Sequence, residues 1–260
     1  TAPNFQPEVG PNDVATRDLA NGVWYNAPPG VLGAAGPGEG HNYSQQNQRF
    51  SLSYLTGGHN FKVGITTQQG VERWETIEVR NALYYNLRNS VPVQVTQWAS
   101  PGSLENRMRM NLGIFAQDQW VINKLTLNLG LRFDYFNAYV PAQTRVAGRF
   151  VGSFDIDRID NAGNFKDLGP RLGVAYDVFG NGKTAVKASL GRYVGSLGAD
   201  FANQINPANA IVLSTNRVWN DVNGNYVPDC DLVNRAANAE CGAIDNTAFG
   251  TIRPNRRIAD

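Results

Sequence analysis

The sequence has few charges and no long apolar run. Only 17% of its 260 residues are charged, and 23 basic against 22 acidic residues leave a net charge of +1. A nucleic-acid-binding domain normally carries a clear basic excess, so we expect no nucleic-acid partner. No apolar run approaches 18 residues, which excludes a transmembrane helix within this sequence.

Histidine and cysteine are also scarce. His41 lies in a glycine-rich segment and His59 in a tight turn, and neither a nucleophile elbow nor a zinc-protease motif is present. We therefore expect that the chain is not an enzyme, and a secreted hydrolase is the least favoured alternative. Cys230 and Cys241 lie in one polar segment, and the pair is compatible with a local disulfide and an oxidising compartment.

Apolar and polar residues alternate with a period of two along much of the chain, which is the pattern of half-buried β-strands. The alternation is clearest over residues 107–136. The same two-strand unit recurs three more times, over residues 49–66, 79–98 and 171–191, and the four turns lie near residues 58, 90, 123 and 181. The sequence therefore predicts eight strands in four hairpins.

The four turns are short, whereas the links between the hairpins are longer and irregular. The links are residues 67–77, 99–105, 137–169 and everything after residue 194. Short turns at one end and long loops at the other are typical of an outer-membrane β-barrel. Strands of about 10–14 residues, at about 3.3 Å per residue, are long enough for a tilted crossing of the bilayer.

We therefore predict an all-β fold: an antiparallel up-and-down transmembrane β-barrel, partial, with about eight strands of a larger barrel and long extracellular loops. Residues 45–193 would form the transmembrane hairpins, residues 1–44 a loop or linker from a preceding barrel region, and residues 194–260 a long extracellular loop region. Such a piece should form a curved open sheet with two unpaired edges. A β-sandwich, which also has one apolar face, is the alternative fold.

The period of two also assigns the two faces of the strands. The apolar face should meet outer-membrane lipid, and it includes Leu112, Ile114, Leu127, Leu129, Leu131, Val174 and Leu190. The polar face should line a hydrated or plugged lumen, and it includes Arg109, Asn111, Asn128, Arg132, Asp177 and Lys187. Aromatic residues near the strand ends, such as Trp98 and Trp120, should form the interfacial girdles.

Residues 221–231 carry oxygen-bearing side chains at alternate positions. The candidate metal ligands are Asp221, Asn223, Asn225, Asp229 and Asp231. Alternating oxygens suit a hard cation, so Ca²⁺ is the candidate cofactor, and no other cofactor is expected. An EF-hand loop would have glycine in place of Tyr226 and glutamate in place of Leu232, so a turn cluster without a metal is the alternative.

Several stretches resemble the TonB-dependent outer-membrane receptors of the Oar-like family, whose members often carry a carboxypeptidase-regulatory-like domain. The more specific stretches surround the two cysteines, at residues 219–232 and 237–242. Further similar stretches are residues 91–95, 115–120, 129–135, 169–174 and 183–187.

This resemblance implies a barrel of about 22 strands around an N-terminal plug, of which the chain would be an internal part. The whole receptor would bind a small-molecule, carbohydrate or peptide ligand at its extracellular loops and import it with energy relayed by TonB. The parts that contact TonB would lie outside this chain. The alternative is a secreted or cell-surface β-rich binding or adhesion protein, with the loop of Cys230 and Cys241 as its contact surface.

Overall fold

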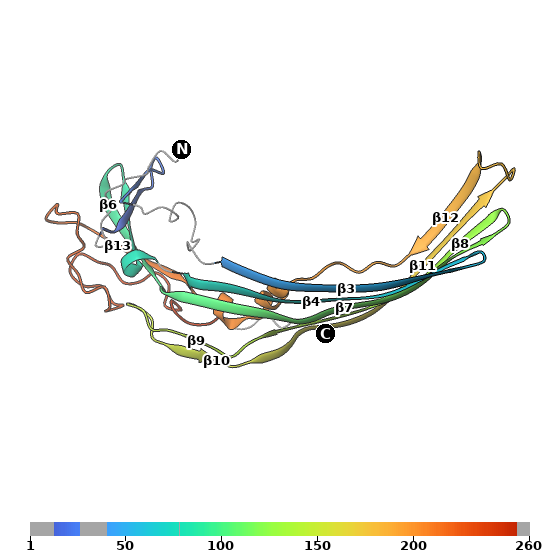
Figure 1. The fold of residues 1–260 in the computed structure, drawn as a ribbon. Helices are drawn as coiled ribbons and strands as arrows, with labels where there is room; N and C mark the ends of the chain where they lie inside the picture. Colours follow the sequence, from blue (N-terminus) through green and yellow to red (C-terminus); the bar gives the residue numbers. More distant parts are fainter. Residues whose placement is uncertain (1–12, 27–40, 78, 254–260) are drawn as a thin grey trace.

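The computed structural model describes residues 13–26, 41–77 and 79–253. Its larger sheet has six strands in the order β12-β11-β8-β7-β4-β3, and we call this sheet the wall (Figure 1). The strands are β3 (His41–Thr56), β4 (His59–Ile77), β7 (Gly102–Ile122), β8 (Leu125–Val140), β11 (Ile159–Asp177) and β12 (Ala185–Gly191). Neighbouring wall strands are antiparallel and follow one another in chain order, which confirms the predicted up-and-down arrangement.

Three short turns lie at one end of the wall and the long connections lie at the other. The turns β3–β4, β7–β8 and β11–β12 lie together at the right-hand end of Figure 1. The connections from β4 to β7 and from β8 to β11 contain further elements. In outer-membrane barrels the short turns face the periplasm. We therefore assign the end with the long connections to the extracellular side.

Five of the six wall strands are longer than the sequence predicted, and β12, with 7 residues, is the exception. β7 has 21 residues and β4 has 19, so β7 extends for about 70 Å at about 3.3 Å per residue. Residues 67–77, most of 99–105 and parts of 137–169 are strand and not links. A bulge at Arg109 of β7, opposite Gln69 of β4, and a second irregularity between Trp74 and Ile77 interrupt the register, yet the backbone still pairs with the neighbouring strands.

The second sheet has five strands in the order β13-β6-β5-β1-β2. Its strands are β1 (Ala15–Asp18), β2 (Trp24–Tyr25), β5 (Leu83–Arg88), β6 (Val91–Trp98) and β13 (Ser214–Val218). This sheet and residues 219–253, which we call the cap, lie at the extracellular end of the wall (Figure 1). The assignment of the hairpin at residues 79–98 to the barrel is therefore wrong, and the described part of the wall has six strands.

The β5–β6 hairpin belongs to the cap because protein covers both of its faces. On one face Leu83 and Val95 pack with Trp219. On the other face Tyr84 is only 9% exposed, and the rings of Trp24 and Trp98 lie against it. A barrel strand leaves one face for lipid, and this hairpin has no such face left.

The remaining elements are short. β9 (Gln143–Arg145) and β10 (Phe154–Ile156) form a two-stranded sheet, and η1 (Arg80–Ala82), η2 (Ala199–Gln204) and η3 (Pro207–Ala210) are 3₁₀ helices. Within the described ranges, no helix is long and apolar enough to cross a membrane.

The hydrogen-bond register shows which side chains share a face of the wall. All seven residues predicted to meet lipid lie on one face, which we call the outer face. Its apolar side chains are exposed, with Ile114 at 46% and Leu131 at 49%. On the opposite, inner face lie Asn111, Asn128, Arg132, Asp177 and Lys187, as predicted.

Arg109 is the exception, because it lies on the outer face and not on the predicted lumen face. The register between β7 and β8 slips at this residue, which makes Arg109 the extra residue of a β-bulge. Its guanidinium reaches Asp160 at 2.7 Å and lies 5.2 Å from the ring of Tyr139 on the outer face. The same bulge turns Met108 to the inner face, where it packs against η2.

The wall is an open sheet, since β3 and β12 are its edges and do not pair with each other. This confirms the prediction of an open sheet for part of a barrel. Each edge strand has a row of backbone N–H and C=O groups without a strand partner. Hydrocarbon does not satisfy such groups, so each edge needs a neighbouring strand in a membrane.

Candidate functional site

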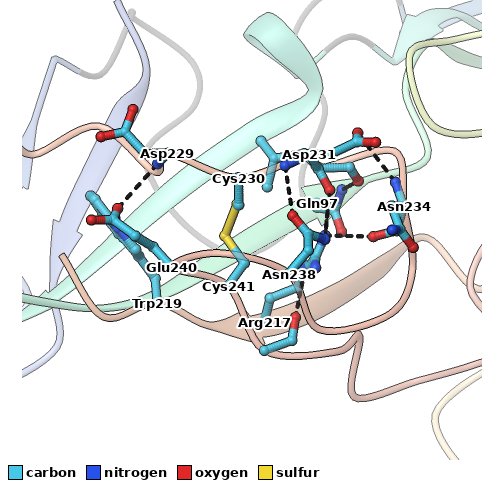
Figure 2. The surroundings of a disulfide bond; sticks show 12 residues. Gln97, Arg217, Trp219, Asp229, Cys230, Asp231, Asn234, Asn238, Glu240 and Cys241 are labelled. Atoms are coloured by element: carbon cyan, nitrogen blue, oxygen red, sulfur yellow. Dashed lines mark hydrogen bonds between the residues drawn. A yellow bond between two sulfur atoms is a disulfide. The ribbon is translucent and has the colours of Figure 1, made fainter. Parts of the chain in front are cut away.

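The structure joins Cys230 and Cys241 by a disulfide in the cap (Figure 2). Their Cα atoms are 5.9 Å apart, within the range that a disulfide needs. Hydrogen bonds cross the loop on both sides of the bond, from the Asp229 N–H to Glu240 and from the Asp231 N–H to Asn238. The disulfide thus reinforces a loop that is already cross-linked by polar contacts.

Arg217 and Trp219 support this loop from within the cap. Trp219 is only 1% exposed and packs with Leu83 and Cys241. The buried guanidinium of Arg217 donates to four backbone carbonyl groups, those of Asp231, Asn234, Ala236 and Gly242. Burial lowers the pKa of Arg217, but an arginine stays protonated in proteins. One buried cation therefore holds several carbonyl groups of the loop together.

The candidate calcium ligands lie in the same region, but their oxygens already accept hydrogen bonds. Asp221 accepts from three backbone N–H groups of the turn that follows it. Asp229 accepts from the side-chain amides of Asn223 and Asn225, at 2.6 and 2.9 Å. Asp231 lies beyond the first cysteine and accepts from two backbone N–H groups. Aspartate and asparagine commonly make such contacts in turns.

Calcium binding stays a prediction. The part of the chain that the structure describes contains no group of three or more His, Cys, Asp or Glu residues able to hold a metal ion. A cation would have to displace the backbone donors that now hold Asp221. Calorimetric titration of the intact protein with Ca²⁺ tests the site: binding heat that Asp221→Asn and Asp229→Asn abolish supports it. An absence of heat leaves the turn cluster.

The inner face of the wall carries a second candidate site, which the sequence did not single out. Arg132 and Asp134 of β8 form an ion pair at 2.8 Å. Asp167 of β11 lies opposite Asp134 in the register and is paired with Arg192, which follows β12. Charges of both signs are therefore gathered on neighbouring strands.

Gly113 of β7 makes room for the guanidinium of Arg132. A Cβ atom at this position would overlap with that guanidinium, so a residue with a side chain would displace it. Across Gly113, Arg132 reaches the hydroxyl oxygen of Thr66 on β4 at 3.4 Å. The guanidinium of Arg132 therefore crosses β7 and links β8 to β4.

The chain after β12 folds back over this part of the inner face, and we call residues 192–204 the inner strap. Its residues 193–197 and the wall side chains, including Arg132 and Arg171, line a cavity of about 480 Å³. The guanidinium of Arg171 lies 4.8 Å from the ring centre of Tyr193. Arg171 makes no ion pair with any residue that the structure describes, so its charge is available to a ligand.

η2 anchors the inner strap to the wall. Phe201 meets Phe136 and Phe165 edge-on, with ring centres 5.7 and 5.5 Å apart. Gly163 lies beneath it, where a Cβ atom would come within 2.8 Å of the Phe201 ring. Met108 and two alanines of η2 complete the cluster. The wall is thus shaped to accept the strap.

The charged and aromatic side chains of the inner cavity suit the binding of a polar ligand. The ring of His59 is bonded to Asp118 at 2.7 Å and stacks between Phe61 and Trp120. These four residues lie on the outer face near the turns, away from the inner cavity. The expectation that the chain is not an enzyme stays a prediction.

The family model of the outer membrane β-barrel domain matches residues 32–258. The chain belongs to this family. The protein is therefore an outer-membrane β-barrel protein, which confirms the predicted fold and location. Comparison with curated proteins and with solved structures gives no match.

Proposed function

We propose that this chain forms part of the wall and extracellular surface of a TonB-dependent outer-membrane receptor of the Oar-like type. The receptor binds a small-molecule, carbohydrate or peptide ligand and imports it with energy relayed by TonB. Membership of the outer-membrane barrel family and the resemblance of residues 219–232 to these receptors support the proposal.

The observation that carries the proposal is the charged cavity beneath the inner strap. A passive pore works best with an unobstructed inner wall, whereas here a strap covers the ion pair of Arg132 and also Arg171, which forms no ion pair with a described residue. A covered site binds its ligand specifically, and the ligand passes only if contacts are broken. We infer that release of the ligand from this site is coupled to the energy that TonB relays.

Uptake by cells that express the full-length receptor tests the proposal. The probes are labelled peptides and oligosaccharides, and we expect accumulation of one class that stops when tonB is deleted. Arg171→Gln should weaken its binding about tenfold or more, because a hydrogen bond to a charged group contributes about 1.5–3 kcal/mol. The matched control is Lys187→Gln, an exposed inner-face residue outside the cavity.

The same experiment distinguishes the proposed transport function from the alternative function. The disulfide-linked cap also suits a cell-surface binding or adhesion protein. In that case cells would attach to the ligand through the cap, neither tonB deletion nor Arg171→Gln would alter attachment, and no ligand would enter.

A further inference from the structure

The outer face carries a cluster of arginines on its extracellular half. Arg109 and Arg158 share the carboxylate of Asp160, at 2.7 and 2.8 Å. Their guanidinium groups also lie 5.2 and 4.2 Å from the ring centre of Tyr139. Arg107 lies opposite Tyr139 in the register and shares the carboxylate of Glu105 with Arg73. Because two cations share the single carboxylate of Asp160, positive charge is left over at this place.

A groove of about 350 Å³ opens beside these arginines. Arg107, Arg109 and Tyr139 line it from β7 and β8, and Ser44 and Gln46 line it from β3. The planar fork of an arginine binds two oxygens of a phosphate at once, and stacking on a tyrosine holds the fork in place. The groove therefore offers several donors and excess positive charge to an anion.

An apolar hollow of about 470 Å³ lies further along the same face, toward the turns. It is lined by Phe50, Val63, Ile65, Ile114, Phe133 and Leu168. Ile114 and Phe133 are partners in the register and lie near the middle of the outer-face stretch between Trp120 and Met110. On β7 this stretch is apolar except for Asp118, which is paired with His59 near the Trp120 end. That stretch is about 34 Å along β7. At a strand tilt of about 40° it covers about 26 Å of membrane, close to the apolar band of barrels.

We propose that the groove and the hollow form one binding site for a phosphorylated lipid of the outer leaflet. Five residues separate Ile114 from Arg109, which is about 17 Å along the strand, and half of the hydrocarbon core is about 15 Å. A lipid whose phosphate lies in the groove therefore places its acyl-chain ends in the hollow. Charge complementarity selects the phosphate, and the position beside the apolar band selects a lipid over a soluble anion.

This site depends on the outer-membrane location of the barrel and not on the transport proposal. A receptor that failed to use TonB would still bind the lipid, and loss of the lipid would leave the inner cavity unchanged. The two proposals therefore fail separately.

Native mass spectrometry of the full-length protein, released from detergent, tests the site. The probes are bisphosphorylated lipid A, the same lipid without its phosphates, and inorganic phosphate. We expect the phosphorylated lipid to be retained best. The paired substitution Arg107→Gln and Arg109→Gln should weaken its retention about 30-fold. Each cation near a membrane surface contributes about 1 kcal/mol, which is roughly fivefold in affinity, and the two losses multiply.

Two further pairs make the test specific. Arg107→Lys with Arg109→Lys keeps both charges but removes the planar guanidinium groups, so retention should fall several-fold. This pair keeps the test informative if the glutamine pair does not fold. Arg49→Gln with Lys62→Gln removes two charges from the inner face, and lipid retention should not change. Unchanged retention in the arginine pairs, an equal loss in the control pair, or equal retention of the lipid without phosphates overturns the proposal. Inorganic phosphate that competes as well as the lipid also overturns it.

Discussion

The wall and the cap are built from the same alternating strands, yet they place their apolar side chains in opposite ways. In the wall, Ile114 is 46% and Leu131 is 49% exposed, whereas in the cap Leu83 is 2% and Trp219 is 1% exposed. Burial of apolar area stabilises a fold by about 25 cal/mol per Å² only where it removes that area from water. The cap therefore has its own core for an aqueous setting, and the outer face of the wall depends on lipid.

The two regions also differ in how their polar groups are held. In the wall, the ion pair of Arg132 with Asp134 lies on the inner face, on the far side of the sheet from the apolar residues. Ion pairs on the outer face, such as Arg109 with Asp160 and His59 with Asp118, lie toward the two ends of the apolar stretch. In the cap, the buried guanidinium of Arg217 lies beside the core and is satisfied by backbone carbonyl groups. A protein in water can enclose polar groups, whereas a barrel wall keeps them away from hydrocarbon.

The largest difference in stability should appear when one tryptophan is replaced by alanine in the cap and another in the wall. Trp219→Ala empties the centre of the cap core and should cost about 3–5 kcal/mol. Trp120→Ala removes a partly exposed ring stacked on His59 and should cost about 1 kcal/mol. Hydrogen exchange of the full-length protein in lipid measures both changes locally. Equal losses of protection would mean that the two regions do not differ as described.

The next largest loss of folding free energy should come from introducing a charge on the outer face of the wall. Ile114→Arg places a cation near the middle of the apolar band and should cost about 2–4 kcal/mol in reversible folding of the full-length receptor into lipid vesicles. Leu129→Arg should cost less, because Leu129 lies beside Asp118 in the register and hence nearer to the interface. The inner-face control, Asn128→Arg, should cost least. The reverse order would mean that the faces are assigned wrongly.

Loss of the disulfide should affect the cap alone. Cys230→Ser with Cys241→Ser opens a ring of about a dozen residues and should cost roughly 3 kcal/mol or less. We expect hydrogen exchange to become faster in residues 219–253 and to stay unchanged in the wall strands. Free thiols titrating in native protein taken from outer membranes would contradict the disulfide itself.

The smallest effect concerns the pH dependence of cap stability that Asp18 causes. Its carboxylate links the turn after β1 to the turn between β5 and β6. Hydrogen bonds from the backbone N–H groups of Ala20 and Ser90 hold the pKa of Asp18 below its ordinary value of 3.8. The stability that Asp18 contributes is therefore fully present above that value and is lost as pH falls through the lower pKa of the folded state. Melting of the cap between pH 6 and pH 2 should show this loss, and Asp18→Asn should remove this part of the pH dependence.

Much of the wall could be predicted from the sequence because the period of two is a local property. The turns and the face of Leu131 and Arg132 follow from it directly. The strand ends could not be predicted, because residues 67–77 are polar and remain strand only through pairing on both sides. The face of Arg109 could not be predicted either, since a bulge shows itself only in the register with a partner strand.

Some features of the candidate sites could also be predicted from the sequence, and others could not. Cys230 and Cys241 could be paired from their spacing, and Arg132 could be assigned to the lumen. The inner strap could not be foreseen, because Tyr193 and Phe201 are isolated aromatic residues in a segment without periodicity. The importance of Phe201 depends on Phe136 and Phe165, which lie on two other strands.

By itself the sequence determined the β-class of this protein, its short turns and the separation of an apolar face from a polar one. A two-residue period leaves little freedom once a strand forms. Only the tertiary structure decided which strands form the wall and which form the cap. The hairpin at residues 79–98 alternates like a barrel hairpin, but Leu232 and Cys241 of the disulfide loop pack on one of its faces, and Tyr84 on the other face is also buried. Whether an alternating strand faces lipid or protein depends on what packs against it, and those partners come from distant parts of the chain.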